Sequence, residues 1–283
     1  MSGYEQELRV AVALVREAGR AILNLLERAA VSTKADGSVV TEADYASDAA
    51  IRAGLRAAFP DDAILTEEGA DDPARLSHDR CWIADPIDGT AYFVARSDDF
   101  DVFLALAVAG RPVVAVSYQP VTGLLLGGVE GGGAWIERPD AEGTPLVFRP
   151  NPDERVIATK GWAGAPENLP MLRRVALRIN RARVVEPTRS LCARALLPGA
   201  AGIDAIAAVP VGRPVDSWEW DVAAVDLIVR EAGGASSDPG GQPLRFNQPK
   251  PLFDQGFVIA NDPEMHRQIV TILAEERDKE RRG

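Results

Sequence analysis

The chain has 283 residues, of which 46% are hydrophobic and 26% charged, and its 31 basic and 42 acidic side chains give a formal net charge of −11. These values exclude wholesale disorder and collagen-like repeats. The acidic balance argues against general nucleic-acid binding, which needs a basic surface. No apolar run reaches the roughly 18 residues of a membrane span, and the acidic, polar N-terminus does not resemble a secretory signal.

The chain has only two cysteines, Cys81 and Cys192, and only two histidines, His78 and His266. Two cysteines cannot form a disulfide framework, so a reducing, cytoplasmic location is expected. No His/Cys cluster is available for a zinc site. Cys81 adjoins an apolar run, which favours buried packing over redox control.

The N-terminal region predicts two helices. Apolar residues recur at helical spacing between Tyr4 and Ala30, which is typical of an amphipathic helix. After a polar stretch, Thr41 can N-cap a second helix that extends to about Phe59, with acidic residues in its first turn.

Short apolar runs broken by Gly, Pro or Asp follow, and they predict an antiparallel sheet. The strands are expected at Ala63–Thr66, Cys81–Ala84, Val102–Ala107, Val113–Tyr118, Leu124–Val129 and Ala134–Ile136. The Pro-, Asp- and Gly-rich segment Arg138–Asp153 is the candidate boundary between an N-terminal α+β half, residues 1–140, and a C-terminal half, residues 141–283.

Strands and helices alternate after this boundary, which indicates an α/β arrangement. Strands are expected at Val156–Thr159, Arg183–Val185, Ala205–Val209 and Phe257–Ala260. Helices are expected at Glu167–Ile179, Ser190–Ala201, Asp221–Ala232 and Pro263–Glu276.

Three segments place acidic side chains at the ends of apolar elements: LTEEG at 65–69, WIADPIDGT at 82–90 and WEWD at 218–221. In the second, Pro86 cannot continue a β-ladder and forces Asp85 into an extended or turn geometry. The carboxylates of Asp85 and Asp88 and the carbonyl of Ile87 can then converge. Hard divalent cations prefer such oxygen ligands, and Mg²⁺ commonly adds waters and substrate phosphate.

Each segment alone has an ordinary explanation. An Asp-Gly pair is usually a turn, and Glu67 with Glu68 is typical of a solvated surface. An acidic residue at a helix start, such as Asp44 or Asp221, usually only complements the helix dipole. The ordered set of segments is what points to chemistry.

That set resembles the inositol monophosphatase superfamily of lithium-sensitive, magnesium-dependent phosphatases. Asp85–Thr90 is similar to its first signature, and Trp220–Ala224 followed by Arg230–Gly234 to its second. Thr66–Glu68 and Val40–Asp44 match two shorter upstream motifs. The resemblance covers nearly the whole chain and implies a mixed α/β (α+β) fold, a layered αβαβα sandwich of the inositol monophosphatase and sugar phosphatase type.

The resemblance also implies a role for each matched residue. Two or three Mg²⁺ ions would be held by the Ile87 carbonyl and by the side chains of Glu67, Asp85, Asp88 and Asp221. The residues that orient or deprotonate the attacking water would be Asp44, Glu67 and Thr90. The substrate contacts would come from Gly89, Thr90, Ser190, Arg194, Glu219 and Asp221.

Substrate choice rests on two further segments. Trp218–Asp221 and Gly241–Asn247 look most similar to the bacterial 3′(2′),5′-bisphosphate nucleotidases, which remove the 3′-phosphate of adenosine 3′,5′-bisphosphate. Inositol 1-phosphate is the alternative, followed by histidinol phosphate and fructose 1,6-bisphosphate. The stretch Thr188–Arg194 lacks the glycine usual in the family, which leaves the contacts of Ser190 and Arg194 open.

An alternative from another class is a catalytically silent homologue that binds a phosphorylated ligand or a partner protein. The intact acidic set argues against it. The expected partner is a small phosphorylated metabolite, with no nucleic acid and no membrane. Homodimers are common among relatives of this kind, although the sequence does not fix the oligomeric state.

Overall fold

The computed structural model describes residues 3–34, 37–149, 153–159, 169–186, 193–197, 202–211 and 215–282. The chain forms two compact units. Unit 1 comprises Met1–Leu146, Glu219–Ile228 and Phe246–Pro251, and unit 2 comprises Val147–Trp218, Val229–Arg245 and Leu252–Gly283. The chain passes from unit 1 to unit 2 after Leu146, close to the boundary expected at residue 140. Two later segments, Glu219–Ile228 and Phe246–Pro251, belong to unit 1 again.

Unit 1 is built on a seven-stranded sheet whose strands lie in chain order. The strands are β3 (Ala63–Thr66), β4 (Arg80–Asp88), β5 (Asp101–Val108), β6 (Arg111–Gln119), β7 (Leu124–Val129), β8 (Gly133–Glu137) and β9 (Thr144–Leu146). All adjacent pairs are antiparallel except β3–β4, which is parallel. The expectation of an antiparallel sheet therefore fails at this edge, because the connection through the short helix η1 (Pro73–Ser77) is long enough to cross over.

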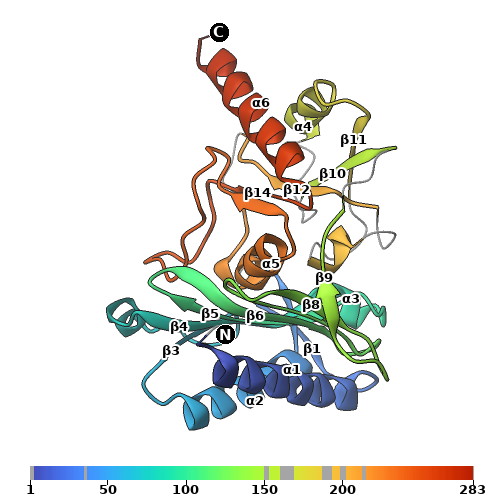
Figure 1. Ribbon diagram of the computed structural model, residues 1–283. Helices are drawn as coiled ribbons and strands as arrows, with labels where there is room; N and C mark the ends of the chain where they lie inside the picture. The colour runs from blue at the N-terminus through green and yellow to red at the C-terminus, as the bar shows by residue number, and fades with distance from the viewer. Residues whose placement is uncertain are drawn as a thin grey trace. The chain divides into compact units, whose positions relative to one another are not determined.

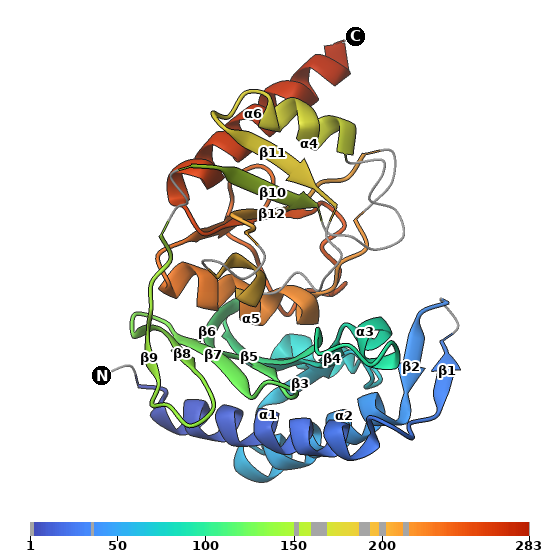
Figure 2. The same cartoon turned by 90° about the vertical axis from the view of Figure 1, so that its right-hand side faces the viewer.

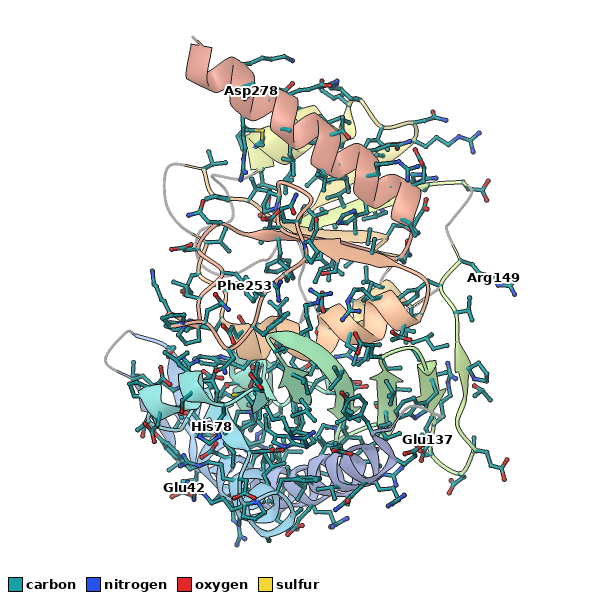
Figure 3. All side chains as sticks on the ribbon, turned by 60° about the vertical axis from the view of Figure 1, so that its left-hand side comes forward. Glu42, His78, Glu137, Arg149, Phe253 and Asp278 are labelled. Atoms are coloured by element: carbon teal, nitrogen blue, oxygen red, sulfur yellow. The ribbon has the colours of Figure 1, made fainter. Side chains whose placement is uncertain are left out.

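Two helices, α1 (Glu5–Leu25) and α2 (Glu42–Ala58), cover one face of this sheet (Figure 1). Their apolar sides and the facing strand residues form the core, whose buried members include Leu14, Ile51, Trp82, Leu104 and Val116. Side chains fill the layer between the helices and the sheet (Figure 3). Glu219–Ile228, the first part of helix α5 (Glu219–Glu231), lies on the other face (Figures 1 and 2).

The start of α2 confirms the predicted cap. Thr41 Oγ1 accepts a hydrogen bond from Ala43 N at 3.1 Å, and Asp44 Oδ2 accepts one from Thr41 N at 2.7 Å. This reciprocal capping box satisfies two amides that have no partner inside the helix. A short hairpin that the sequence did not predict, β1 (Val31–Thr33) and β2 (Val39–Thr41), leads into it.

Unit 2 contains a five-stranded sheet in the order β11-β10-β12-β14-β13. These strands are β10 (Arg155–Thr159), β11 (Ala182–Val185), β12 (Ala205–Ala208), β13 (Ala235–Ser237) and β14 (Phe257–Ala260). β10 is parallel to β11 and β12, and β14 is antiparallel to β12 and β13. Helices α4 (Leu169–Ala176) and α6 (Pro263–Arg282) pack against the sheet (Figure 2).

Several elements differ from the expectation. The helix expected at Ser190–Ala201 is described only around the short 3₁₀ helix η3 (Ala193–Leu196), and the rest of that range lies outside the described residues. The short helix α3 (Thr90–Val94) and the strands β9 and β13 were not predicted. Among the helices that the structure describes, none is long and apolar enough to cross a membrane.

Candidate metal centre

The end of β4 positions two of the predicted ligands. The strand continues to Asp88 rather than ending at Asp85, but its pairing with β5 is irregular between these two residues. Pro86 lies within this interruption and has no N–H to donate to a ladder. Ile87 N instead donates to Asp85 Oδ1 at 3.0 Å, which fixes the orientation of that carboxylate.

Gly89 turns the chain from β4 directly into α3. Its φ of +94° lies in the left-handed region, and a Cβ atom at this position would lie 3.1 Å from the Asp99 carbonyl oxygen. Glycine avoids both the strain and the close contact. Tyr92 N and Phe93 N donate to Gly89 O at 2.8 and 3.1 Å. The turn therefore places Thr90 immediately after the carboxylate of Asp88.

Three carboxylates converge within unit 1. Asp85, Asp88 and Asp221 each offer one oxygen, and these oxygens all lie within 4.8 Å of one another. Asp85 is buried and the other two are half-buried. Asp221 comes from the first turn of α5, far from the others in the chain. An all-oxygen set of this kind suits a hard divalent cation such as Mg²⁺.

The electrostatics of the cluster agree with this fit. Burial raises the pKa of Asp85 well above its ordinary value, and the negative charges of Glu67, Asp88, Asp221 and Asp44 raise it further. The ionised cluster is therefore unfavourable on its own, because like charges repel in a poorly solvated place. A bound cation would relieve that repulsion.

Glu67 lies close to this cluster but is held by a lysine. Its Oε1 accepts a hydrogen bond from Lys34 Nζ at 2.8 Å, and the same ammonium donates to Glu68 Oε1 at 2.6 Å. Burial raises the pKa of Glu67 to about 7, although the charge and hydrogen bond of Lys34 oppose the shift. The Lys34 ammonium therefore lies between these two carboxylates.

Asp44 and Thr90 form a direct pair. Thr90 Oγ1 donates to Asp44 Oδ1 at 2.9 Å and also lies 3.2 Å from the carbonyl oxygen of Ile87. The second oxygen of Asp44 accepts hydrogen bonds from Thr41 N and Thr41 Oγ1 at 2.7 and 2.6 Å. Burial raises the pKa of Asp44, although the hydrogen bonds from Thr41 and Thr90 oppose the shift. Asp44 is thus a buried, fully oriented acceptor beside the cluster.

One supporting residue was missed by sequence reasoning. Ser47 Oγ donates to the carbonyl oxygen of Pro86 at 2.8 Å, and its side chain is buried. This hydrogen bond ties α2 to the interrupted end of β4. The signal was available, because residues i and i+3 of a helix share a face and Ser47 follows Asp44 at that spacing.

Glu219, an expected substrate contact, is held by two backbone amides. Its side chain is 1% exposed, and its carboxylate oxygens accept hydrogen bonds from Asn247 N at 2.6 Å and Gln248 N at 2.8 Å. Burial raises its pKa to about 7, although these hydrogen bonds and the charge of Arg75 oppose the shift. Glu219 therefore holds a loop of unit 1, and its expected substrate contact stays a prediction.

Arg75 completes this network. It is 3% exposed, and its guanidinium donates to Asp71 Oδ1 at 2.6 Å, to Asn247 Oδ1 at 2.7 Å and to Gln248 O at 2.8 Å. Asn247 Nδ2 returns a hydrogen bond to Arg75 O at 3.1 Å. Helix η1, the loop at 247–248 and the first residue of α5 are therefore joined within unit 1.

The remaining predicted substrate contacts lie elsewhere. Arg194 belongs to η3 in unit 2, where it is partly buried. Ser190 lies outside the described residues. The roles proposed for these two residues remain predictions.

Comparison with known proteins agrees with this geometry. The model of the inositol monophosphatase family matches residues 4–278. Nus factor SuhB of Pasteurella multocida is 31% identical over 271 residues, which cover 93% of this chain and 94% of the relative. The 3′(2′),5′-bisphosphate nucleotidase CysQ of Escherichia coli O157:H7 is 30% identical over 253 residues, which cover 87% and 96%.

Solved structures give the same result. The IMPase of Thermotoga maritima superposes with a TM-score of 0.74 at 27% sequence identity, covering 96% of this chain and 98% of that protein. The fold class expected from the sequence, helices layered with multi-stranded sheets, is thereby confirmed. The chain belongs to the inositol monophosphatase family.

Proposed function

We propose that this protein is a Mg²⁺-dependent phosphomonoesterase that hydrolyses a small phosphate ester. The observation that carries the proposal is the convergence of Asp85, Asp88 and Asp221 beside the Thr90–Asp44 pair. Two or three ions are proposed, held by these carboxylates together with Glu67 and the Ile87 carbonyl. Bound Mg²⁺ would activate water and offset negative charge on the phosphate.

The Thr90–Asp44 pair supplies the proton acceptor. The Thr90 hydroxyl has a single proton, and it is directed to Asp44 at 2.9 Å, so the lone pairs of Oγ1 can accept a proton from a nearby water. Asp44 is held by Thr41 and can take the proton in turn. Acid–base assistance of this kind contributes roughly 10²–10⁴-fold to a rate.

The phosphate group is proposed to lie against the start of α3. The first amides of a helix have no intrahelical acceptor. The left-handed turn at Gly89 places the amides of Gly89 and Thr90 directly after Asp88. These N–H groups and the carboxylate-held cations would thus contact the same phosphate.

The proposed substrate is adenosine 3′,5′-bisphosphate, hydrolysed at its 3′-phosphate. This choice is supported by the segments 218–221 and 241–247 and by the similarity to CysQ. Inositol 1-phosphate is the alternative, because the IMPase of Thermotoga maritima matches the fold over nearly the whole chain. Histidinol phosphate and fructose 1,6-bisphosphate follow.

A role without catalysis is the competing proposal. Relatives named Nus factor SuhB are as similar to this chain as CysQ is, at 31% and 30% identity. The expectation that the protein has no nucleic-acid partner therefore stays a prediction. The complete set of acidic residues, Glu67, Asp85, Asp88 and Asp221 with Thr90, favours an active enzyme.

The proposal is tested by measuring phosphate release from these four esters with Mg²⁺ and with EDTA. The esters are then compared by their kcat/KM values. The bisphosphate nucleotide should be hydrolysed most efficiently, and EDTA should abolish release. Asp88→Asn should lose activity, whereas Asp61→Asn, on an exposed loop of the same unit, should retain it. Absence of Mg²⁺-dependent release from every ester would favour the silent homologue, and a preference for inositol 1-phosphate would replace the proposed substrate.

A further inference from the structure

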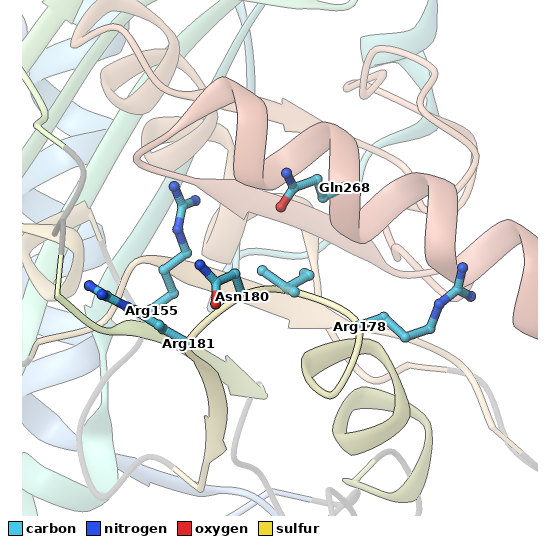
Figure 4. Close-up of a pocket in the computed structure, with 6 residues that line it drawn as sticks. Arg155, Arg178, Asn180, Arg181 and Gln268 are labelled. Carbon is cyan, nitrogen blue, oxygen red and sulfur yellow. The ribbon is translucent and has the colours of Figure 1, made fainter.

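Unit 2 contains a polar pocket that the proposed function does not use. Its volume is about 360 Å³, and it lies at the turn between α4 and β11, beside the start of β10 and one side of α6 (Figure 4). Figure 4 shows Arg155, Asn180 and Arg181 grouped at one end, Arg178 at the other, and Gln268 on α6. Ile179 is the sixth lining residue.

The lining has one sign of charge. Three arginines, two carboxamide residues and one isoleucine line the pocket, and none of these described residues is acidic. The chain as a whole carries a formal charge of −11. The pocket therefore collects three arginines from two separate segments of a chain that is acidic as a whole. Guanidinium groups match the geometry of phosphate oxygens, with which they form paired hydrogen bonds.

The walls of the pocket are held in place before any ligand binds. Arg155 N donates to Arg181 O at 3.0 Å, and Ala182 N donates to Ile179 O at 3.1 Å, so the turn is fixed to the start of β10. The Arg155 guanidinium donates through Nη1 to Asp262 Oδ2 at 2.8 Å. A fixed guanidinium loses little conformational entropy when it binds an anion.

Carboxylates outside the lining pair with all three arginines. Asp262 binds Arg155, and Glu275 with Glu276 binds Arg178 from α6. Arg181 is the most exposed of the three, with 59% of its side chain accessible, and its ion pair with Asp153 is long at 3.9 Å. Because these carboxylates offset the positive charge of the arginines, selectivity for phosphate would come from the directed hydrogen bonds of the guanidinium and carboxamide groups and not from net charge.

We infer that this pocket binds a small molecule through a dianionic phosphate group, with Arg155 and Arg181 as the principal contacts and the carboxamides of Asn180 and Gln268 as further donors. A volume of about 360 Å³ has room for a phosphorylated metabolite rather than for inorganic phosphate alone. The inference is independent of the proposed phosphatase activity, because every lining residue belongs to unit 2 and none is a predicted ligand of the metal centre.

The test measures binding of inorganic phosphate to the full chain after divalent ions have been removed on a chelating resin, so that the carboxylate cluster of unit 1 repels the probe. Calorimetry and thermal melting at constant ionic strength compare phosphate with chloride and citrate. The variants are Arg181→Gln and Arg155→Gln. The matched control is Arg183→Gln, an exposed arginine of β11 that pairs with Glu154 and does not line the pocket.

Phosphate should bind and raise the melting temperature more than chloride does, and each pocket variant should weaken phosphate binding about tenfold. Arg183→Gln should bind phosphate as the unaltered protein does. The inference fails if phosphate acts no differently from chloride, if citrate alone binds, or if the pocket variants and the control behave alike. Arg155→Gln also loses the ion pair with Asp262. If Arg155→Gln does not fold, phosphate binding by Arg181→Gln tests the inference.

Discussion

The backbone N–H of Asn247 donates to Glu219 Oε2 at 2.6 Å, and this contact joins two segments that are 28 residues apart. Gln248 N occupies the other carboxylate oxygen at 2.8 Å. Glu219 begins α5, and Asp221, in the same helical turn, contributes an oxygen to the acidic cluster. The hydrogen bonds of Glu219 therefore fix the start of the helix that delivers Asp221.

Replacement of Glu219 should destabilise the protein in a graded manner. Glu219→Ala leaves the N–H groups of Asn247 and Gln248 without their acceptors, which should cost about 2–4 kcal/mol of unfolding free energy, whereas Glu219→Gln keeps one acceptor oxygen and should cost less. Chemical denaturation of the two variants measures their free energies of unfolding and so the order of these losses. Glu5→Ala, at the exposed first residue of α1, is the matched control. Equal stability of the two alanine variants would contradict the supporting role of Glu219.

Magnesium should stabilise the protein as well as permit turnover. A cation bound between Asp85, Asp88 and Asp221 relieves their mutual repulsion, and ligand at about 100 times its dissociation constant adds roughly 2.7 kcal/mol. Thermal melting with and without Mg²⁺ should show a rise in the unaltered protein and in Asp61→Asn. Asp88→Asn should lose most of that rise. A full Mg²⁺ response in Asp88→Asn would remove that residue from the metal site.

The Thr90 hydroxyl should act in the chemical step. Thr90→Ala breaks the hydrogen bond to Asp44 and should lower kcat about 10²–10³-fold. Thr90→Ser keeps the hydroxyl and should retain most of the activity. Asp44 still accepts two hydrogen bonds from Thr41, so α2 should stay capped in both variants. Similar kcat values for the alanine and serine variants would show that the hydroxyl has no catalytic role.

His266 should make unit 2 less stable in acid. Burial lowers its pKa below the ordinary value of 6.5, although a hydrogen bond from its ring to the backbone of Val258 opposes the shift, and Nε2 lies 3.0 Å from Ser237 Oγ. His266 therefore binds a proton more readily in the unfolded chain than in the folded protein. The free energy of unfolding consequently falls as the pH drops below about 6.5.

Denaturation of His266→Gln between pH 7.5 and 5.5 checks this linkage. The variant should lose less stability over that range than the unaltered protein does. His78→Gln, on the exposed side of unit 1, is the matched control. Identical pH profiles for the His266 variant and the unaltered protein would refute the assignment.

Most helices and strands could be predicted from short sequence patterns, because neighbouring residues determine whether they form. The Thr41 cap, the three strands Ala63–Thr66, Leu124–Val129 and Phe257–Ala260, and the amphipathic first helix follow from capping chemistry, apolar runs and helical spacing. The parallel placement of β3 could not be predicted, because strand direction depends on the path of the connection and not on the strand itself. The left-handed turn into α3 was predicted only as a turn.

The family and the acidic residues at element ends could be predicted without a structure, because motif order and residue chemistry are properties of the chain. Which of those residues meet depends on the folded chain. It brought Asp221 within 4.8 Å of Asp85 and Asp88, placed Lys34 on Glu67, and turned Glu219 toward two backbone amides. The convergence of residues that are far apart in the sequence depends on how the chain packs. The sequence also does not distinguish a carboxylate that is fully hydrogen-bonded inside the protein from one that is open to a ligand.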